Sequence, residues 1–144
     1  MNSFGLTFHH FGLAVRSPEK AFAYLEALGY SAGYSVLDPL QKVNLAMQYH
    51  DEMPDVEVIW PGDESSPIDS ILKRNESLIY HLCYTSADAQ ASVASMKAAG
   101  FAVMPTTEPR AALLFGGVEV SFYYIDGFGL IELIHGEPTP SSIL

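Results

Sequence analysis

The chain has 144 residues, 49% of them hydrophobic and 17% charged, and its seven basic and seventeen acidic residues give a net charge of −10. This composition excludes a disordered or fibrous protein, and the acidic excess disfavours nucleic acid or an anionic membrane as a partner. No apolar run approaches the ~20 residues that span a bilayer, the N-terminus does not resemble a secretory signal, and the single cysteine, Cys83, cannot form an internal disulfide. We therefore expect one cytoplasmic globular domain over residues 1–144.

The first half of the sequence predicts a strand, a helix and three further strands. Ser17 and Pro18 follow the first apolar run, and we expect Ser17 to cap a helix whose first turn contains Pro18. Apolar side chains at helical spacing then lead to Gly29, a natural helix end. The predicted strands cover residues 6–15, 30–38, 43–49 and 56–60.

The second half predicts the same order after a linker. Turn-forming residues over 61–66 and a short helix within 67–75 connect the two halves. Asp88 is expected to cap the second long helix and Gly100 to end it. The predicted strands cover residues 78–85, 101–106, a hairpin of 112–115 with 118–125, and 130–135.

An internal repeat relates the two halves. A shift of 71 residues places His10 on His81, Ser17 on Asp88 and Gly29 on Gly100, so strand, helix and glycine recur together. The repeat predicts an α+β fold of tandem βαβββ modules, about 6–61 and 77–136, that form a curled mixed sheet around a cleft.

The last strands of the two halves also correspond. Val56-Glu-Val-Ile aligns with Ile131-Glu-Leu-Ile, so Glu57 matches Glu132 at a shift of 75 residues (132 − 57). An ionised carboxylate among apolar neighbours costs several kcal/mol unless it is paired, protonated or bound to a metal. No basic residue occurs inside these strands, which disfavours pairing with arginine.

Two histidines and two glutamates at duplicated positions predict a metal site. His10, Glu57, His81 and Glu132 together offer the nitrogen and oxygen donors that suit Zn, Ni, Co, Mn or Fe(II), with one or two positions left for water or substrate. Taken singly, each histidine is explained as a core residue and each glutamate as a solvent-facing residue of an edge strand. A degenerate site that binds nothing is a further alternative. No residues for any other cofactor are predicted.

The strand and helix motifs resemble a known superfamily. The segments FHHFGLAVRSPEKAFAYLEALGY, IYHLCYTSADAQASVASMKAAGF, VEVIWP and LIELIHG are similar to the vicinal oxygen chelate superfamily, which includes glyoxalase I, methylmalonyl-CoA epimerase, fosfomycin-resistance proteins and extradiol dioxygenases. The resemblance covers about residues 6–136, and residues 66–72 look more like the epimerase than like glyoxalase I. In the glyoxalase and epimerase branches the metal ligands match His10, Glu57, His81 and Glu132.

One position departs from the epimerase pattern. The epimerases carry a catalytic glutamate in the loop before the strand that here begins near Val43, whereas this chain has Asp38-Pro-Leu-Gln41. The resemblance therefore implies two-base chemistry only if Asp38 substitutes for that glutamate.

A divalent ion that chelates two neighbouring substrate oxygens makes the proton α to a carbonyl removable. Glu132 or Glu57 is then the candidate base, with metal-bound water as an alternative. We expect a metal-dependent isomerase or lyase that transfers a proton next to a carbonyl or thioester, similar to methylmalonyl-CoA epimerase. The alternatives are a lyase like glyoxalase I (lactoylglutathione lyase), a non-catalytic small-molecule binding or resistance protein, and an extradiol-type dioxygenase, which the fourth ligand disfavours.

Four other side chains lie near the predicted ligands in sequence. Tyr123 or Tyr124 either orients a substrate oxygen or packs in the core, and Cys83 shares a strand face with His81. His9 is expected on the face opposite His10. We further expect a homodimer that acts on a small molecule.

Overall fold

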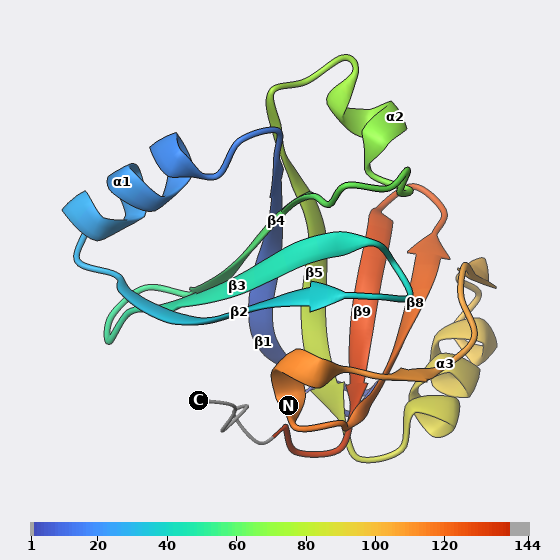
Figure 1. Ribbon diagram of the computed structural model, residues 1–144. Helices are drawn as coiled ribbons and strands as arrows, with labels where there is room; N and C mark the ends of the chain where they lie inside the picture. Colours follow the sequence, from blue (N-terminus) through green and yellow to red (C-terminus); the bar gives the residue numbers. More distant parts are fainter. Residues whose placement is uncertain (1, 139–144) are drawn as a thin grey trace. The chain divides into compact units, whose positions relative to one another are not determined.

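The computed structural model describes residues 2–138 and contains helices, strands and one 3₁₀ turn (Figure 1). Their order confirms the predicted α+β fold of tandem βαβββ modules. No helix in this described part is long and apolar enough to cross a membrane. The elements are β1 (Leu6–Val15), α1 (Glu19–Ala27), β2 (Ser31–Asp38), β3 (Val43–Tyr49), β4 (Asp55–Pro61), α2 (Asp69–Leu72), β5 (Ser77–Ser86), α3 (Ala89–Ala98), β6 (Val103–Pro105), β7 (Arg110–Ala111), η1 (Leu113–Phe115), β8 (Glu119–Ile125) and β9 (Gly129–His135).

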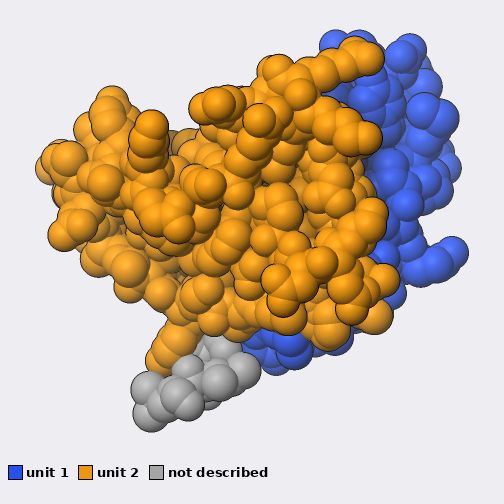
Figure 2. All heavy atoms as spheres, turned by 45° about the horizontal axis from the view of Figure 1, so that its top comes forward, with its two compact units in different colours: residues 1–9, 81–142 blue, residues 10–80, 143–144 orange. Residues whose placement is uncertain are grey.

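The described residues form two compact units (Figure 2). Unit 1 comprises residues 2–9 and 81–138, and unit 2 comprises residues 10–80. The chain passes from one unit to the other within two strands, between His9 and His10 in β1 and between Tyr80 and His81 in β5. His10 is therefore the first residue of β1 that belongs to unit 2, and His81 is the first residue of β5 that belongs to unit 1.

Unit 2 contains a mixed sheet in the order β2-β3-β4-β1, in which only the β1–β4 pair is parallel. Successive residues of a strand point to opposite faces, and each face of this sheet carries a buried apolar cluster. One face packs against α1 through a cluster that includes Val15, Leu25 and Val58. The other face contains Ala14 and packs with Ile59, Ile68 and Leu72.

Unit 1 contains a mixed sheet in the order β5-β9-β8-β6, with β7 also paired to β8. Only the β5–β9 pair is parallel. Helix α3 packs on one face through Met96 and Ala89, which join Leu6, Val103 and Leu133 in a buried cluster. The two units thus repeat one arrangement, in which the first and last strands of a module pair in parallel.

The helix ends confirm the predicted glycine positions and one of the two predicted caps. Gly29 and Gly100 both adopt positive φ, and in each case the next residue donates its N–H to a carbonyl of the last helical turn. Asp88 caps α3 by accepting the N–H of Ala91 at 3.0 Å. The prediction that Ser17 caps α1 is wrong. Pro18 holds the capping position with helical dihedral angles, so Ser17 lies one residue too early to reach the free N–H groups.

The predicted strand at 112–115 is also wrong, because Leu113–Phe115 form the 3₁₀ turn η1. Leu114 and Phe115 are adjacent and both buried, an arrangement that an alternating strand does not give. The N–H groups of Phe115 and Gly117 both bond to the carbonyl of Ala112. In place of residues 112–115, the short strand β7 pairs with the start of β8, and β7 begins inside the predicted loop 107–110. The predicted strand 101–106 and helix 67–75 are shorter than expected.

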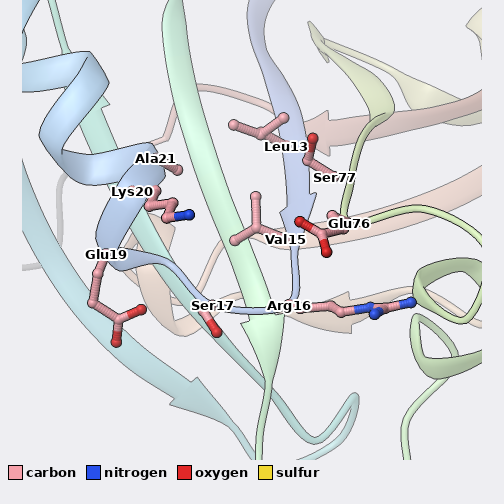
Figure 3. A pocket seen from close by; sticks show the side chains of 9 residues that line it. All are labelled: Leu13, Val15, Arg16, Ser17, Glu19, Lys20, Ala21, Glu76 and Ser77. Atoms are coloured by element: carbon pink, nitrogen blue, oxygen red, sulfur yellow. The ribbon is translucent and has the colours of Figure 1, made fainter.

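A hollow of about 600 Å³ lies in unit 2 beside α1 and the end of β1 (Figure 3). Arg16 and Lys20 line it together with Glu19 and Glu76, so the charges of its walls balance. The Nε of Arg16 donates to the carbonyl of Leu72 at 2.5 Å, which ties the end of β1 to the end of α2. The remaining lining residues are Leu13, Val15, Ser17, Ala21 and Ser77.

Candidate functional site

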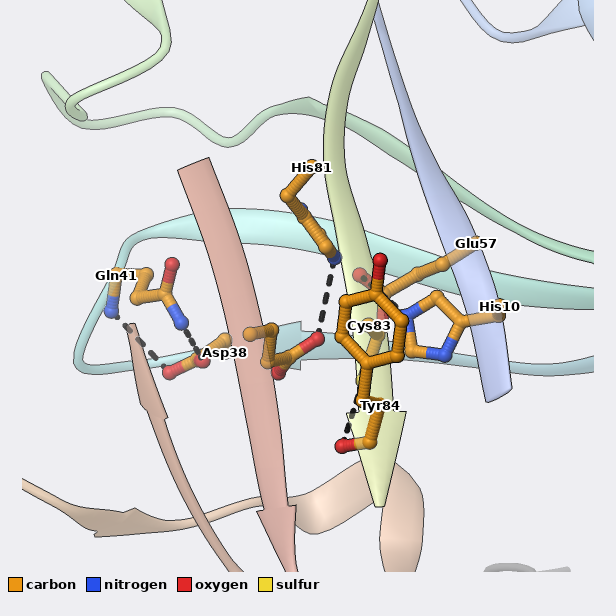
Figure 4. A network of polar contacts seen from close by, with 8 residues as sticks. His10, Asp38, Gln41, Glu57, His81, Cys83 and Tyr84 are labelled. Atoms are coloured by element: carbon orange, nitrogen blue, oxygen red, sulfur yellow. Dashed lines mark hydrogen bonds and ion pairs between the residues drawn. The ribbon is translucent and has the colours of Figure 1, made fainter. Parts of the chain in front are cut away.

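In unit 2, the strand register brings His10 and Glu57 together. Glu57 of β4 lies opposite Gly12 of the parallel neighbour β1, and His10 is two residues before Gly12 on the same face. His10 Nε2 and Glu57 Oε1 are 3.8 Å apart, and both side chains are buried (Figure 4).

Unit 1 repeats this register with His81 and Glu132. Glu132 of β9 lies opposite Cys83 of the parallel neighbour β5, and His81 is two residues before Cys83. His81 Nε2 and Glu132 Oε1 are 3.1 Å apart, and both side chains are buried. The strand register of histidine and glutamate is therefore the same in both halves, although the two side chains are closer together in unit 1.

An apolar side chain faces each glutamate from the antiparallel neighbour strand. Met47 of β3 lies opposite Glu57, and Phe122 of β8 lies opposite Glu132. The ring of Phe122 also packs edge-on against His81, with 5.4 Å between ring centroids. The sequence interpretation missed both residues, although the shift of 75 residues that aligns the glutamates also aligns Met47 with Phe122.

The four residues fit the donor set of a divalent ion. All are buried, and they offer two imidazole nitrogens and two carboxylate oxygens. Two donors that each lie about 2.1 Å from one ion, at a bond angle of about 90–110°, are separated by about 3.0–3.4 Å. The 3.1 Å separation in unit 1 falls in this range, and the 3.8 Å separation in unit 2 exceeds it by an amount that a small side-chain rotation removes. The pairs could therefore hold a metal.

Asp38 lies at the end of β2 and caps the turn that follows it. Its Oδ1 accepts the N–H groups of Leu40 and Gln41, and its Oδ2 accepts the side-chain amide of Gln41 at 3.3 Å (Figure 4). Asp38 pairs with Val43, which shares a sheet face with Met47 and hence with Glu57. Sequence reasoning did not assign Gln41, three residues after Asp38, any role beside this carboxylate.

The two tyrosines of β8 lie on opposite faces. Tyr123 packs with the cluster under α3, and its hydroxyl accepts a hydrogen bond from Ser121 at 3.0 Å. Tyr124 is half-exposed and shares the face of Phe122 and Glu132, so it is the tyrosine on the side of the candidate base.

His9 packs edge-on against Phe115. Burial, together with the neighbouring Cys83, raises the pKa of Tyr84.

This fold, with one buried histidine–glutamate pair in each of two repeated modules, defines a class of protein. Residues 9–122 match the family described as the Glyoxalase/Bleomycin resistance protein/Dioxygenase superfamily. The match covers most of the chain, so the chain belongs to this superfamily, and the resemblance inferred from the sequence is confirmed.

The solved structures that it resembles include methylmalonyl-CoA epimerases. The chain is 23% identical to the epimerase from Mycobacterium tuberculosis, with a TM-score of 0.77 over 96% of this chain and 93% of that one. It is 22% identical to a variant of the Streptomyces coelicolor epimerase in complex with 2-nitronate-propionyl-CoA, with a TM-score of 0.73 over 91% and 98% of the two chains. Similarity at this level of identity establishes the fold. No curated protein gives a significant match.

Proposed function

We propose that the chain is a metal-dependent epimerase that moves the α-proton of a 2-substituted acyl-CoA thioester. His10, Glu57, His81 and Glu132 are the proposed ligands of one divalent ion. The observation that carries the proposal is the strand register that both halves share. In each half a buried glutamate is paired with a residue of the parallel neighbour strand, and the histidine lies two residues before that paired residue.

The similar solved structures support the proposed substrate class. One of them is a methylmalonyl-CoA epimerase in complex with methylmalonyl-CoA and NH₄⁺, which is 20% identical to this chain with a TM-score of 0.73. The family membership supports an enzyme, since the superfamily takes its name partly from glyoxalase and dioxygenase activities.

The proposed reaction needs one group that removes the α-proton and one that returns a proton to the opposite face of the carbon. A bound divalent ion would polarise the thioester carbonyl and so make the α-carbon more acidic. Glu132 is the proposed base, because its carboxylate is buried beside the proposed metal position, where Phe122 lies opposite it on the neighbouring strand. Glu57 is the alternative base.

Asp38 is the proposed partner on the opposite face of the carbon. Its carboxylate accepts the backbone N–H groups of Leu40 and Gln41, which hold its orientation. Epimerisation runs in both directions, so Asp38 would return a proton to the carbon in one direction and remove it in the other, while Glu132 takes the opposite role.

Deuterium exchange tests the proposal. The metal-loaded protein is incubated in D₂O with methylmalonyl-CoA and related 2-substituted thioesters, and we expect deuterium at the α-carbon. Glu132→Gln should suppress the exchange, because an amide oxygen still coordinates a metal but does not accept the proton. Asp126→Asn is the matched control, since it removes an exposed carboxylate from the β8–β9 turn and should leave the exchange unchanged.

Asp38→Asn separates the two proposed bases. One base is sufficient to exchange a proton with solvent, whereas inversion needs a donor on the other face, so this variant should slow racemisation more than exchange. Turnover of a hemithioacetal without any thioester exchange would instead assign a glyoxalase-like lyase. Binding of a thioester without exchange would assign a binding protein. The homodimer and the cytoplasmic location stay predictions.

A further inference from the structure

A second hollow in unit 2, of about 550 Å³, lies between α1 and the strands β2, β3 and β4. Gln48 and Ala46 of β3 line it, whereas Met47 between them faces Glu57. Because alternate residues point to opposite faces, this hollow lies on the face of the sheet opposite Glu57. Its size falls in the ~300–1,000 Å³ range of small-molecule sites. The other lining residues are Phe22, Glu26, Tyr30, Ser31, Ala32, Gly33, Ser35 and Trp60.

A buried amide is the polar feature of this hollow. Gln48 is only 5% exposed and shares its face with Ala46 and Val56, where an apolar residue would pack without polar cost. Its Nε2 donates one hydrogen bond, to the carbonyl of Met47 at 2.9 Å. No donor from residues 2–138 bonds to its Oε1. Although the residue is buried, Oε1 itself is not one of the buried side-chain atoms that lack a partner, so it is accessible from the hollow and can accept a hydrogen bond from a ligand.

Aromatic rings form the walls around this amide. Phe22 and Trp60 pack edge-to-face with 5.5 Å between ring centroids. The hydroxyl of Tyr30 is held by the carbonyl of Pro54 at 2.6 Å, so Tyr30 contributes its ring. Planar ligands gain from stacking on such rings.

The charge of the walls excludes an anionic ligand. Glu26 is the one carboxylate of the lining, and none of the lining residues is a lysine or arginine. A phosphate in this hollow would meet a negative charge without a compensating cation. The hollow therefore suits an uncharged ligand, unlike a CoA thioester with its phosphates.

We propose that this hollow binds a neutral planar heteroaromatic ring whose edge carries an N–H donor beside an acceptor, as in an uncharged adenine nucleoside. The side-chain amide of glutamine matches the N6 and N7 edge of adenine with two hydrogen bonds. Here Oε1 would accept from N6, and the second hydrogen of Nε2 would donate to N7. The site is separate from the proposed reaction and does not depend on it.

Trp60 provides a direct measurement, because it is the only tryptophan of the chain. The full-length protein is titrated with adenosine while the tryptophan fluorescence is recorded, and we expect a saturable change. Purine riboside, which lacks the exocyclic amino group, should bind about 10-fold more weakly, because one lost hydrogen bond costs about 1.4 kcal/mol. Adenosine monophosphate should give no saturation in the same concentration range.

Two variants separate amide recognition from simple hydrophobic binding. Gln48→Met keeps the length of the side chain without the amide and should weaken adenosine binding at least about 10-fold, while Lys20→Ala, which faces the other hollow, should leave it unchanged. Glu26→Lys should allow adenosine monophosphate to bind. Circular dichroism checks that each variant is folded, and if Gln48→Met does not fold, the Glu26→Lys result decides.

Three results would overturn the proposal. These are no saturable change with adenosine, equal affinity for adenosine and purine riboside, and adenosine binding that Gln48→Met leaves intact.

Discussion

The carboxylate of Glu132 lies 3.1 Å from the imidazole of His81, and both side chains are buried in the same unit. Two arrangements are consistent with this distance. The residues either coordinate one metal ion with a neutral imidazole, or form an ion pair with a protonated one. The two arrangements differ in their response to a chelator and to the loss of His81.

We expect His81→Ala to abolish metal binding. The purified protein should contain about one divalent ion per chain by elemental analysis, and a chelator should lower its Tm because bound metal stabilises the folded state. His81→Ala should contain almost no ion and should not respond to the chelator. His135→Ala, in the same strand as Glu132, is the control that keeps the ion.

An ion pair gives the opposite pattern. The chelator would change nothing in the unmodified protein, and His81→Ala would lower the free energy of unfolding by about 3–5 kcal/mol, because it leaves the buried Glu132 carboxylate uncompensated. That result would rule out the metal site.

The two helix caps predict unequal effects of equivalent substitutions. Asp88→Ala should lower the free energy of unfolding by about 1 kcal/mol, because it removes the acceptor for the N–H of Ala91. Ser17→Ala should change it by less than about 0.5 kcal/mol, since Ser17 does not cap α1. Urea unfolding of both variants measures the difference, and equal losses would contradict the assignment of Pro18 as the capping residue.

Tyr30 should make the protein less stable in alkali. Burial and the nearby Asp55 carboxylate raise its pKa above the ordinary value of 10.0. The unfolded chain therefore releases the phenolic proton first, so the free energy of unfolding should be constant below about pH 10 and fall as the pH rises from there toward the folded pKa.

Tyr30→Phe should weaken this alkaline loss, although Tyr49 and Tyr84, whose pKa values are also raised, still contribute. At neutral pH the variant should be less stable by about 1 kcal/mol, because the hydrogen bond to the carbonyl of Pro54 is lost. Unfolding curves from pH 7 to 11 measure both effects. Tyr24→Phe is the control, since Tyr24 is exposed, and an identical alkaline response in both variants would contradict the assignment to Tyr30.

Lys42 is the one residue other than glycine with positive φ in the described part of the chain, at 59°. This conformation costs a residue with a side chain about 1 kcal/mol, and β-branched residues more. Lys42→Val should therefore lower the Tm. Lys42→Gly should raise the Tm slightly or leave it unchanged, because glycine removes the strain of positive φ while its greater freedom in the unfolded chain offsets part of that gain. The exposed ion pair with Glu64 contributes little. A valine variant as stable as the glycine variant would contradict this reading.

Local pattern and the internal repeat were sufficient to predict the two repeated modules and the four candidate ligands, but not β7 and η1. Strand alternation, helical spacing and the glycines at 29 and 100 depend on neighbours a few residues away, so they can be recognised in one sequence. The repeat also showed that Glu57 and Glu132 occupy corresponding positions in the two halves, which no local pattern indicates.

Only the tertiary structure decided where several side chains point. A strand pattern leaves open which face a residue such as Glu57 takes, and the parallel register of β1 and β4 sets it beside His10. The turn hydrogen bonds of Asp38 depend on how the chain reverses after β2. Gln48 looks like an ordinary polar strand residue in the sequence, and its burial becomes apparent only when α1 covers that face. Contacts between residues distant in sequence decide these features, and no short segment of the chain encodes them.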